Sequence, residues 1–379
     1  MLSNIFIFSK NSVSYLLSTL ISWILAHHKN NKSQNLLFIN TGRIGDLVVS
    51  SALLENPDVF NNYNEVVFVV NENYAELFND YSGRVQFVKY DHKKYKYSLK
   101  YRLDFLNRLR NKCFSYCINL TAARGMLNDE ITLLSGAKHK YCLNKNYRYL
   151  GNFYGKKMDK KYDGIIADDI INEYEKHFEL MKFLNKDYTK SFQIENTFTF
   201  RTDKINLSDD LSGKQNFIVI APFSSERNRD WSKNKLQDLI RVLSNKYLII
   251  LLGSKLQQRE LYSLKDDSNS VEVMAGLLKL NEVAGILKRC KLFIGGDSGL
   301  THIALKIGIP FISLIGGGQF GRFFPIGESE KRKFLYHKVD CFGCEWNCIH
   351  PERYCITEVK VETVLTEANK ILKLNSSNT

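Results

Sequence analysis

The sequence has few cysteines and no long apolar run, and both absences exclude whole classes of protein. Eight cysteines among 379 residues are too few for a small secreted disulfide scaffold, so we expect reduced thiols in a cytosolic chain. The longest largely apolar run, Val13–Ala26, would rise only ~21 Å as a helix against a hydrocarbon core of ~30 Å. A membrane span is therefore not expected. With 44% hydrophobic residues, the composition is that of a soluble globular protein, and the length suggests about two domains.

The apolar run Val13–Ala26 is instead expected to form a helix with one of two roles. It either lies in a membrane interface, where Tyr15 and Trp23 are suitable amphipathic anchors, or packs on the protein's own surface. A signal peptide is disfavoured, because Lys10 is the only basic residue before the run and Ala26–His28 is a poor cleavage site. The sequence leaves the two surface roles open.

Positive charge is concentrated between Arg84 and Lys161, where 19 lysines and arginines stand against five acids. The net charge of the whole chain is +13, so the remaining residues are close to neutral. Within this basic segment, Lys89–Arg102 and Lys138–Arg148 interleave cations with tyrosines. Such a pattern suits a polyanion, either nucleic acid or an anionic membrane and its phosphorylated glycolipids. A solvated lysine-rich face is the alternative.

Short apolar runs bounded by turn residues alternate with helical stretches along the chain. Buried parallel strands are predicted at residues 36–40, 66–70, 85–88, 116–120, 217–221, 247–252, 292–294 and 311–315. Helices are predicted at residues 236–243, 280–290 and 300–306. The alternation predicts an α/β protein with doubly wound parallel sheets. The polar stretch Thr202–Gly213 separates two sets of such units and marks the predicted domain boundary.

The first segment that carries chemistry lacks both common nucleotide-binding fingerprints. Its glycines, Gly42 and Gly45, have the spacing G-x-x-G, with neither a Walker lysine nor a complete G-x-G-x-x-G. They allow a tight loop after a strand that ends at Asn40, and a helix is expected to begin at Asp46 or just after it. The Asp46 carboxylate can cap that helix or act as a general base in the crevice beyond the strand. The sequence leaves both roles open.

Two later segments have the residues of a phosphate site. The strand Phe217–Ala221 runs into a hydroxyl-rich loop with Arg227 and Arg229, which together with a following helix start suit a diphosphate. Further on, Asp297–Gly299 follows a strand and opens a helix, so its capping residues and free N–H groups can bind phosphate. The next strand ends in Gly316–Gly318, which is expected to leave a ligand unobstructed by side chains.

Together these segments resemble glycosyltransferase family 9, the ADP-heptose:lipopolysaccharide heptosyltransferases. The resemblance covers about residues 35–370 and rests on Gly42–Asp46, Pro222–Trp231, Leu251–Ser254, Asp297–His302, Gly308–Pro310 and Gly316. It implies an α/β GT-B fold of two Rossmann-like doubly wound parallel-sheet domains that face a central cleft. The implied parts are an apolar N-terminal helix at 1–34, an acceptor-binding domain at 35–205, a nucleotide-sugar-binding domain at 206–356, and a C-terminal helix that crosses back to the first domain, with a polar tail, at 357–379.

The resemblance also implies residue roles. Asp46 matches the family's proposed base, and Arg229 holds the position where a Lys usually binds the donor diphosphate. The implied donor-binding residues are Ser224, Ser225, Arg227, Arg229, Gly253, Ser254, Glu260, Asp297, Ser298, Gly299, Thr301, His302 and Gly316. The implied acceptor-binding residues are Arg43, Gly45, Lys93, Lys94 and Arg124. Relatives contact the ribose through a Glu for which no acid stands at the expected distance here, so Glu260 or an unmatched residue serves.

The implied reaction is an inverting, metal-independent transfer of a heptose or related sugar from a nucleotide-diphosphate donor, ADP-heptose in the family. The acceptor would be a lipopolysaccharide core or another anionic cell-surface glycan, reached by a cytoplasmic enzyme peripheral to the inner face of the membrane. No cofactor is required in this scheme, and the Asp-x-Asp motif that holds Mg or Mn in the other major glycosyltransferase fold is absent. The alternative is a non-catalytic polyanion- or nucleic-acid-binding protein that uses the basic segment.

Four of the eight cysteines form a cluster near the C-terminus. The members of this cysteine cluster are Cys341, Cys344, Cys348 and Cys355. Their spacing, C-x2-C-x3-C-x6-C, could supply a tetrahedral thiolate site for structural zinc or an iron–sulfur cluster, although it differs from the zinc-ribbon pattern. Disulfides and free thiols are the alternatives. A terminal helix is predicted beyond the cluster, at Val359–Leu372.

Overall fold

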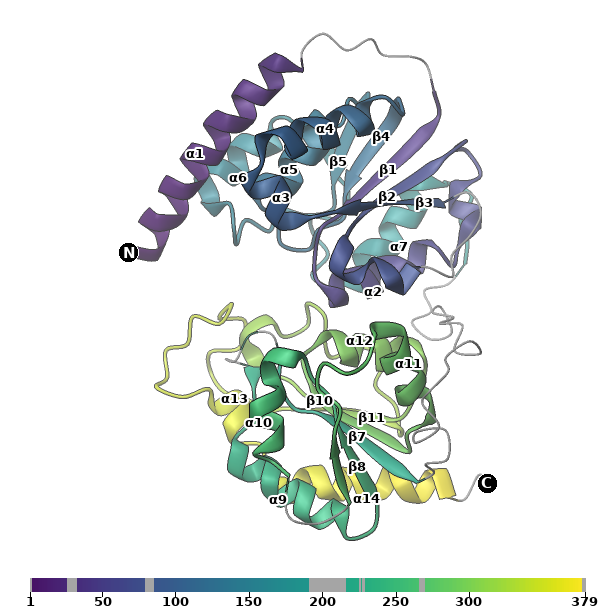
Figure 1. Cartoon of the computed structure of the whole chain (residues 1–379), viewed down its shortest axis with the longest axis vertical. Coiled ribbons are helices and arrows are strands. Elements are labelled where there is room, and N and C mark those ends of the chain that lie inside the picture. Colours follow the sequence, from purple (N-terminus) through teal and green to yellow (C-terminus); the bar gives the residue numbers. More distant parts are fainter. Residues whose placement is uncertain are drawn as a thin grey trace. The chain divides into compact units, whose positions relative to one another are not determined.

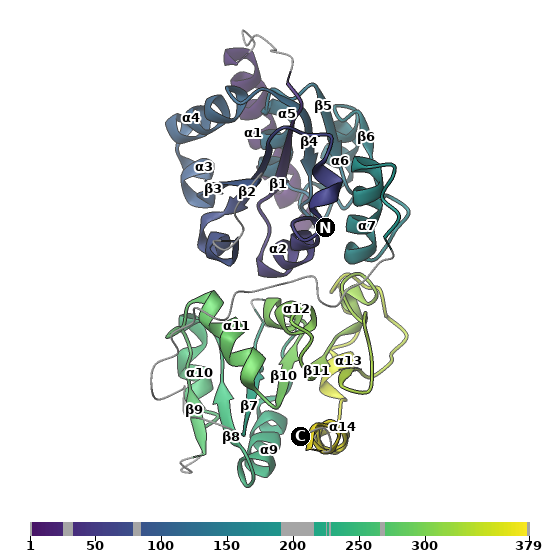
Figure 2. The ribbon, with the colours of Figure 1, turned by 90° about the vertical axis from the view of Figure 1, so that its right-hand side faces the viewer.

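The computed structural model describes residues 2–25, 33–78, 85–190, 216–224, 226, 229–265 and 270–376. The chain divides into two compact units, residues 1–192 and 193–379, each built on one six-stranded parallel sheet (Figures 1 and 2). The expected α/β architecture with two doubly wound parallel sheets is confirmed. The predicted boundary between residues 205 and 206 lies outside the described residues.

The sheet of the first unit has the strand order β3-β2-β1-β4-β5-β6. Its strands are β1 (Asn35–Asn40), β2 (Val66–Asn71), β3 (Val85–Tyr90), β4 (Phe114–Asn119), β5 (His139–Cys142) and β6 (Gly164–Ile165). The direction of winding reverses between β1 and β4, which pair in parallel. In open α/β sheets the ligand crevice lies beyond the carboxyl ends of the strands at this reversal. The loop after β1 is therefore where a site is expected.

Helices cover both faces of this sheet. They are α1 (Leu2–Ile24), α2 (Ile44–Ser50), α3 (His92–Tyr97), α4 (Leu99–Arg110), α5 (Met126–Leu134), α6 (Gly151–Asp159) and α7 (Glu173–Leu184). One core joins Leu37 and Val67 of the sheet to Phe105 of α4 and Ile131 of α5, all buried. Short 3-10 turns at 51–53, 57–60 and 72–78 complete the unit.

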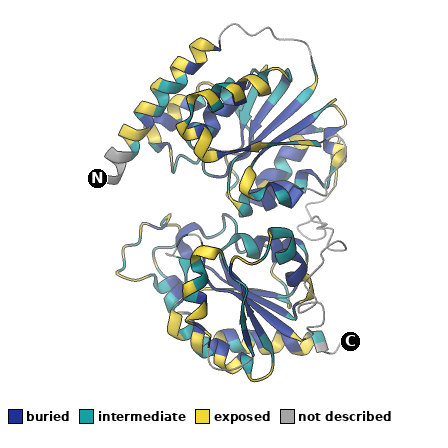
Figure 3. Ribbon diagram, in the orientation of Figure 1, coloured by how far each residue is buried: buried dark blue, intermediate teal, exposed yellow. Residues whose placement is uncertain are grey.

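Helix α1 has one apolar face packed against the unit and a second one exposed. It lies against α5 and α6 and buries Ile21 completely (Figure 1). On the opposite face Leu16 is 70% exposed and Trp23 77% exposed. Figure 3 shows exposed residues along much of this helix. Among the described residues, no helix is long and apolar enough to cross a membrane. The helix thus packs on the protein's own surface and still presents an apolar face to solvent.

The sheet of the second unit repeats the arrangement, with the order β12-β11-β10-β7-β8-β9. Its strands are β7 (Phe217–Ala221), β8 (Leu248–Leu251), β9 (Val271–Val273), β10 (Leu292–Gly296), β11 (Phe311–Leu314) and β12 (Arg332–Leu335). Its helices are α9 (Lys233–Ser244), α10 (Gln258–Tyr262), α11 (Leu280–Arg289), α12 (Gly299–Lys306), α13 (Tyr354–Thr357) and α14 (Val361–Ser376), with 3-10 turns at 255–257 and 317–319. Here the reversal falls between β7 and β10.

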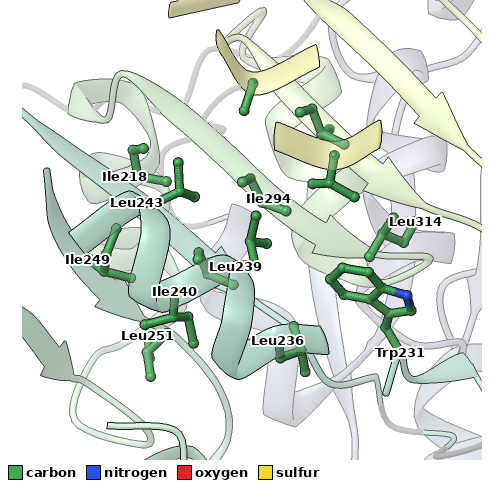
Figure 4. Packing of buried hydrophobic residues seen from close by; sticks show 14 of the residues in the cluster. Ile218, Trp231, Leu236, Leu239, Ile240, Leu243, Ile249, Leu251, Ile294 and Leu314 are labelled. Atoms are coloured by element: carbon green, nitrogen blue, oxygen red, sulfur yellow. The ribbon is translucent and has the colours of Figure 1, made fainter. Parts of the chain in front are cut away.

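The core of the second unit forms where α9 and α14 meet the sheet. Leu236, Leu239, Ile240 and Leu243 follow the helical spacing of one face of α9 and pack on strand residues such as Ile294 (Figure 4). Helix α14 adds its own apolar face to this cluster and contacts α9, β10 and β11. The predicted terminal helix is thus present, and its crossing to the first unit stays a prediction.

Candidate functional site

In the second unit, most of the predicted donor-binding residues follow β7 and β10, the strands that flank the reversal of winding. Arg229 lies beyond β7, while Asp297 and Ser298 directly follow β10. The two strands are hydrogen-bonded neighbours, with Ala221 opposite Gly295. Because both loops leave the same edge of the sheet, residues from distant parts of the sequence meet where an open α/β sheet binds its ligand.

The Arg229 guanidinium is the centre of this group. Its Nη1 lies 3.3 Å from Asp297 Oδ2, and its Nη2 lies 3.6 Å from Glu226 Oε2. The same Nη2 donates to Gln319 Oε1 at 3.4 Å, and the guanidinium carbon stands 5.1 Å from the centre of the Trp346 ring. Its Nε is buried without a hydrogen-bond partner among the described residues. Arg229 is therefore held by four neighbours and keeps a buried Nε donor unused.

Asp297, Ser298 and Gly299 stand where α12 begins. Ser298 is the N-cap residue and Gly299 the first residue of the helix, and Ser298 Oγ is buried with no partner in the part of the chain that the structure describes. Burial raises the pKa of Asp297 above its usual value, against the opposing effect of Arg229. The unused donors of Ser298 and Arg229, with the free N–H groups of the first helical turn, suit an anion such as a diphosphate.

Thr301 and His302 lie in the first turn of α12, but their side chains are buried in the interior of the second unit. Thr301 Oγ1 donates to the Gly296 carbonyl at 2.6 Å, which fastens α12 to β10. His302 is 3% exposed, and burial, followed by the effect of Arg229, lowers its pKa to about 3. The imidazole is therefore neutral near pH 7 and does not supply a positive charge to a diphosphate.

The loop after β7 is tied to the loop after β8 by Gln257, which sequence reasoning missed. Its Nε2 donates to the Ser224 carbonyl at 3.1 Å, and its Oε1 accepts the Ser254 backbone N–H at 2.8 Å. A Cβ on Gly253 would meet the Gln257 side chain, so this glycine permits the link. Glu260 follows, half-buried, in α10. The predictions at two further positions lie outside the described residues: Ser225 and Arg227.

The glycine turn Gly316–Gly318 is filled by aromatic rings. A Cβ on Gly316 would lie 2.6 Å from the Trp346 ring, and one on Gly317 would lie 2.5 Å from the Phe342 ring. The expectation that this turn lacks a side-chain barrier is wrong, because the missing side chains make room for the segment that carries the cysteine cluster. Donor contact by the backbone of Gly316 stays a prediction.

In the first unit, Asp46 lies in the first turn of α2, directly beyond β1. The helix begins at Ile44 and therefore starts earlier than predicted. Asp46 Oδ2 accepts the Arg43 backbone N–H at 3.0 Å, so the carboxylate caps the helix from its third position. A Cβ on Gly42 would collide with this carboxylate. The structure thus shows the capping role, and the role of Asp46 as a general base stays a prediction.

A buried network that sequence reasoning missed holds the Asp46 turn. Asn40 Nδ2 donates to the Asp46 carbonyl at 3.1 Å and to Ser50 Oγ at 2.6 Å. Ser50 Oγ lies 2.9 Å from His177 Nε2, and His177 Nδ1 lies 2.8 Å from the Glu173 carbonyl. Because a carbonyl only accepts, His177 Nδ1 carries a proton. The Ser50 hydroxyl also donates to the Asp46 carbonyl at 3.0 Å. Helix α7 is thereby fixed to α2, and no motif in the sequence signals it.

Four of the five predicted acceptor-binding residues are accessible. Arg43 and Lys93 are exposed, and Gly45 is half-buried in α2. Lys94 is exposed and lies 3.1 Å from the Asp91 carboxylate. Their contact with an acceptor stays a prediction.

The fifth, Arg124, is fully buried. Its Nε and Nη2 bind the two carboxylate oxygens of Asp129 at 3.0 and 2.8 Å, and its Nη1 binds Asp159 at 2.6 Å. The prediction of Arg124 as an acceptor contact is therefore wrong, since its guanidinium is used inside the unit.

The basic segment exposes fewer of its tyrosines and cations than its composition predicts. Tyr90 and Tyr95 are completely buried with their ring centres 5.3 Å apart, so they cannot stack on nucleic-acid bases. Arg102 is buried in a two-contact ion pair with Glu130. The prediction of an interleaved cation and tyrosine face is wrong at these positions, because the tyrosines belong to the core.

The cysteine cluster consists of free thiols that line one small cavity together with Trp346. Burial and then the neighbouring Cys344 thiol raise the pKa of both Cys341 and Cys348, so these three side chains adjoin. Thiols are ligands that zinc and iron accept, but within the described residues no three of these four sulfur atoms lie within 4.8 Å of one another. Within the described ranges, one group of three ligating residues has its ligand atoms within 4.8 Å of one another: Asp340, Cys341 and His350.

Comparison with known protein families gives a match over residues 102–343 to the model of glycosyltransferase family 9 (heptosyltransferase). Lipooligosaccharide heptosyltransferase 2 of Campylobacter jejuni is 21% identical over 221 residues, which are 53% of this chain and 66% of that protein. The alignment thus spans just under two thirds of that relative's own length.

Among solved structures, the E. coli heptosyltransferase WaaC with ADP-2-deoxy-2-fluoro heptose is similar with a TM-score of 0.65 and 18% identity. The match covers 88% of this chain and 99% of that one. The iron-containing dodecameric glycosyltransferase TibC of enterotoxigenic E. coli matches with a TM-score of 0.54 and 13% identity, over 93% of this chain and 78% of that one. These likenesses establish the GT-B fold.

Proposed function

The chain belongs to glycosyltransferase family 9, and from this membership we propose that it transfers a heptose from ADP-heptose to a lipopolysaccharide core or another cell-surface glycan. The ADP-sugar analogue named with the WaaC structure supports an ADP-linked donor. The observation that carries the proposal is the pair of buried, unpartnered donors, Arg229 Nε and Ser298 Oγ, on the two loops beyond β7 and β10. A donor diphosphate would accept from both.

The proposed chemistry is a direct displacement that inverts the anomeric carbon and needs no catalytic metal. Asp46 takes the proton of the acceptor hydroxyl, whose oxygen forms the new bond to the anomeric carbon. The bond from that carbon to the diphosphate oxygen breaks, and ADP leaves with the electron pair. Arg229 and the N-terminal turn of α12 stabilise the negative charge that develops on the leaving group.

Replacement of Asp46 by Asn tests the base while preserving the cap. An amide oxygen can still accept the Arg43 N–H that Asp46 Oδ2 accepts now, but it cannot take a proton at neutral pH. We expect Asp46→Asn to lower kcat by about 10²- to 10⁴-fold with the Kd for ADP unchanged. Transfer is measured with purified full-length protein and ADP-heptose, and binding by calorimetry. Wild-type turnover in Asp46→Asn would reduce Asp46 to a helix cap.

The finer features of the reaction need separate measurements. A panel of nucleotide sugars identifies the donor, and NMR of the product identifies the anomeric configuration. Activity is measured after brief EDTA treatment, with the metal content of the protein determined before and after. Failure of every nucleotide sugar to bind would overturn the proposal and favour the polyanion-binding alternative.

We further propose that the enzyme is a cytoplasmic protein that docks on an anionic membrane surface through the outer face of α1. Along that face Val13, Leu16, Leu20 and Trp23 are between 51% and 77% exposed. The neighbouring lysines supply matching charge: Lys156, Lys157, Lys160 and Lys161 are exposed, and two of them stand over the Tyr15 ring at 4.0 and 4.8 Å. An apolar stripe flanked by lysines suits an interface rich in acidic lipid, where a glycolipid acceptor would be held.

Vesicle cosedimentation tests this surface. We expect the full chain to bind vesicles of phosphatidylglycerol and phosphatidylcholine, more weakly at high salt, and to bind phosphatidylcholine alone poorly. The double variant Leu16→Ser, Trp23→Ser should bind at least about tenfold more weakly. Leu256→Ser is the matched control, since Leu256 is 94% exposed but lies in the second unit. Equal binding by the double variant and the control would refute the proposal.

A further inference from the structure

Helix α2, which carries Asp46, is too short to fix its own orientation. It has seven residues and passes directly into the 3-10 turn 51–53. Isolated helices shorter than about 12 residues are marginal in water, so tertiary contacts must hold α2 in place. Its apolar residues Leu47, Val48 and Val49 are buried, but apolar burial is non-directional and leaves the rotation of the helix weakly defined. Directional contacts are needed to fix the Asp46 side chain.

Such contacts meet at the Ser50 hydroxyl, one helical turn after Asp46. Its Oγ lies 3.0 Å from the Asp46 carbonyl, 2.6 Å from Asn40 Nδ2 and 2.9 Å from His177 Nε2. Ser50, Asn40 and His177 are each 2% exposed or less. Buried polar contacts constrain geometry strictly, because a buried group that loses its partner keeps the full cost of its desolvation. The Asp46 turn is therefore held from β1 by Asn40 and from α7 by His177.

The His177 ring is itself oriented from within α7, which lies beside α2 (Figure 1). Its Nδ1 donates to the Glu173 carbonyl, 2.8 Å away and one turn earlier in the same helix. This bond fixes the rotation of the ring and leaves Nε2 for Ser50. The Asn172 side chain caps the start of α7 by accepting two backbone N–H groups. The place of His177 thus follows from regular secondary structure and not from a loop.

We propose that His177 is a positioning residue of the transfer reaction, which acts through Ser50 to hold the Asp46 carboxylate in line with the acceptor hydroxyl. The inference rests on the proposed function, in which Asp46 is the base. If the contact is lost, α2 can rotate, and the carboxylate leaves the Arg43 N–H that it now accepts at 3.0 Å. A displacement of about 1 Å at the reacting atoms can cost about 10²-fold in rate.

Three variants separate positioning from simple core packing. His177→Leu removes both ring nitrogens, whereas His177→Gln can place a polar atom near the position of Nε2. We expect His177→Leu to lower kcat by about 10- to 100-fold with the Kd for ADP unchanged, and His177→Gln to recover most of this loss. Leu180→Ala is the matched control, because Leu180 is completely buried in the same helix and apolar.

Transfer is measured with the purified full chain, ADP-heptose and a truncated lipopolysaccharide core, at a temperature where all three variants are folded. Leu180→Ala should be less stable than the wild type and keep its kcat. Equal losses of kcat in Leu180→Ala and His177→Leu, or no recovery in His177→Gln, would reduce His177 to a residue of the core.

A double-mutant cycle tests the route through Ser50. Ser50→Ala deletes the hydroxyl that joins His177 to the Asp46 turn, so His177→Leu should lower kcat little further in that background. Losses that add fully in the double variant would mean that His177 acts by another route, and would overturn the proposal. Should His177→Leu not fold, His177→Asn replaces it, since the shorter amide can still donate to the Glu173 carbonyl but does not reach Ser50.

Hydrogen exchange separates this inference from the proposed function. The Arg43 N–H is bonded to the Asp46 carboxylate, so the amides of residues 42–47 report on the turn without any substrate. By mass spectrometry, we expect these amides to exchange faster in His177→Leu than in the wild type or in Leu180→Ala. Exchange at the wild-type rate in His177→Leu would refute the inference. If exchange rises while Asp46→Asn keeps wild-type turnover, the contact is confirmed, and the proposed base and the positioning role are both overturned.

Discussion

His302 should make the stability of the second unit sensitive to acid, and the effect has a definite sign. The pKa of this buried imidazole is about 3 in the folded protein, against an ordinary value of 6.5, because burial disfavours the charged form. Unfolding exposes the ring, which then takes up a proton whenever the pH lies below about 6.5. A group whose pKa is lower in the folded protein than in the unfolded chain stabilises the fold at pH values above its unfolded pKa. This stabilisation is lost as the pH falls toward the folded pKa.

The size of the effect follows from the difference between the two pKa values. Each unit of pH below the unfolded pKa of His302 lowers the free energy of unfolding by about 1.4 kcal/mol until the folded pKa is reached. Between pH 7.5 and pH 5 the imidazole alone therefore removes about 2 kcal/mol. His302→Gln keeps a polar side chain at the site but cannot titrate. The variant should be less stable than the wild type at pH 7.5 and lose about 2 kcal/mol less on acidification.

Urea unfolding followed by tryptophan fluorescence measures this difference in stability for the second unit of the chain. Of the three tryptophans, Trp231 and Trp346 are buried in the second unit, whereas Trp23 is already 77% exposed in the folded protein. The emission change thus reports on the second unit, and other titrating groups cancel when the two variants are compared. Parallel stability curves for wild type and His302→Gln would refute the reasoning, because they would mean that His302 protonates freely in the folded state.

Three further predictions concern Arg124 inside the first unit, Gly42 beside the Asp46 carboxylate, and Arg229 of the proposed donor site. Arg124→Met should lower the free energy of unfolding of the first unit by about 3 to 5 kcal/mol, because it leaves Asp129 buried without its partner. At a temperature where the variant is folded, the KM for the acceptor should be unchanged. Circular dichroism measures the stability and a transfer assay measures the KM. Gly42→Ala should lower kcat at least about tenfold without changing ADP affinity, because the new methyl displaces the Asp46 carboxylate. Arg229→Lys should weaken ADP binding about tenfold in calorimetry, and unchanged affinity would contradict the role of its fork-shaped guanidinium.

The central strands of both sheets could be predicted because they are buried on both faces and read as continuous apolar runs. All eight predicted strands occur, with ends displaced by a few residues. The strands that the sequence did not reveal are short and polar at several positions, such as His139–Cys142 and Arg332–Leu335. These two strands stand on the outer side of β4 and of β11, where pairing with an existing strand, rather than their own composition, fixes their structure.

The candidate site was predictable where a motif fixes a position at the end of a strand, and unpredictable where a role depends on a distant partner. Asp46 and Asp297 follow buried strands, so their place could be read from the sequence. The error at Arg124 arose because charge counting cannot show which acid meets which base inside the fold. The basic segment has only five acids, and three of them, Asp129, Glu130 and Asp159, bind buried or partly buried arginines.

The same dependence on partners explains why an arginine suits position 229, where the family resemblance leads one to expect a lysine. A lysine ammonium is a compact point charge and lacks the planar fork that reaches Asp297, Glu226 and Gln319 while its carbon stands 5.1 Å from the centre of the Trp346 ring. The planar guanidinium meets all four neighbours and still leaves Nε for a ligand. The Trp346 ring thus stands beside the guanidinium that the proposed donor site would use.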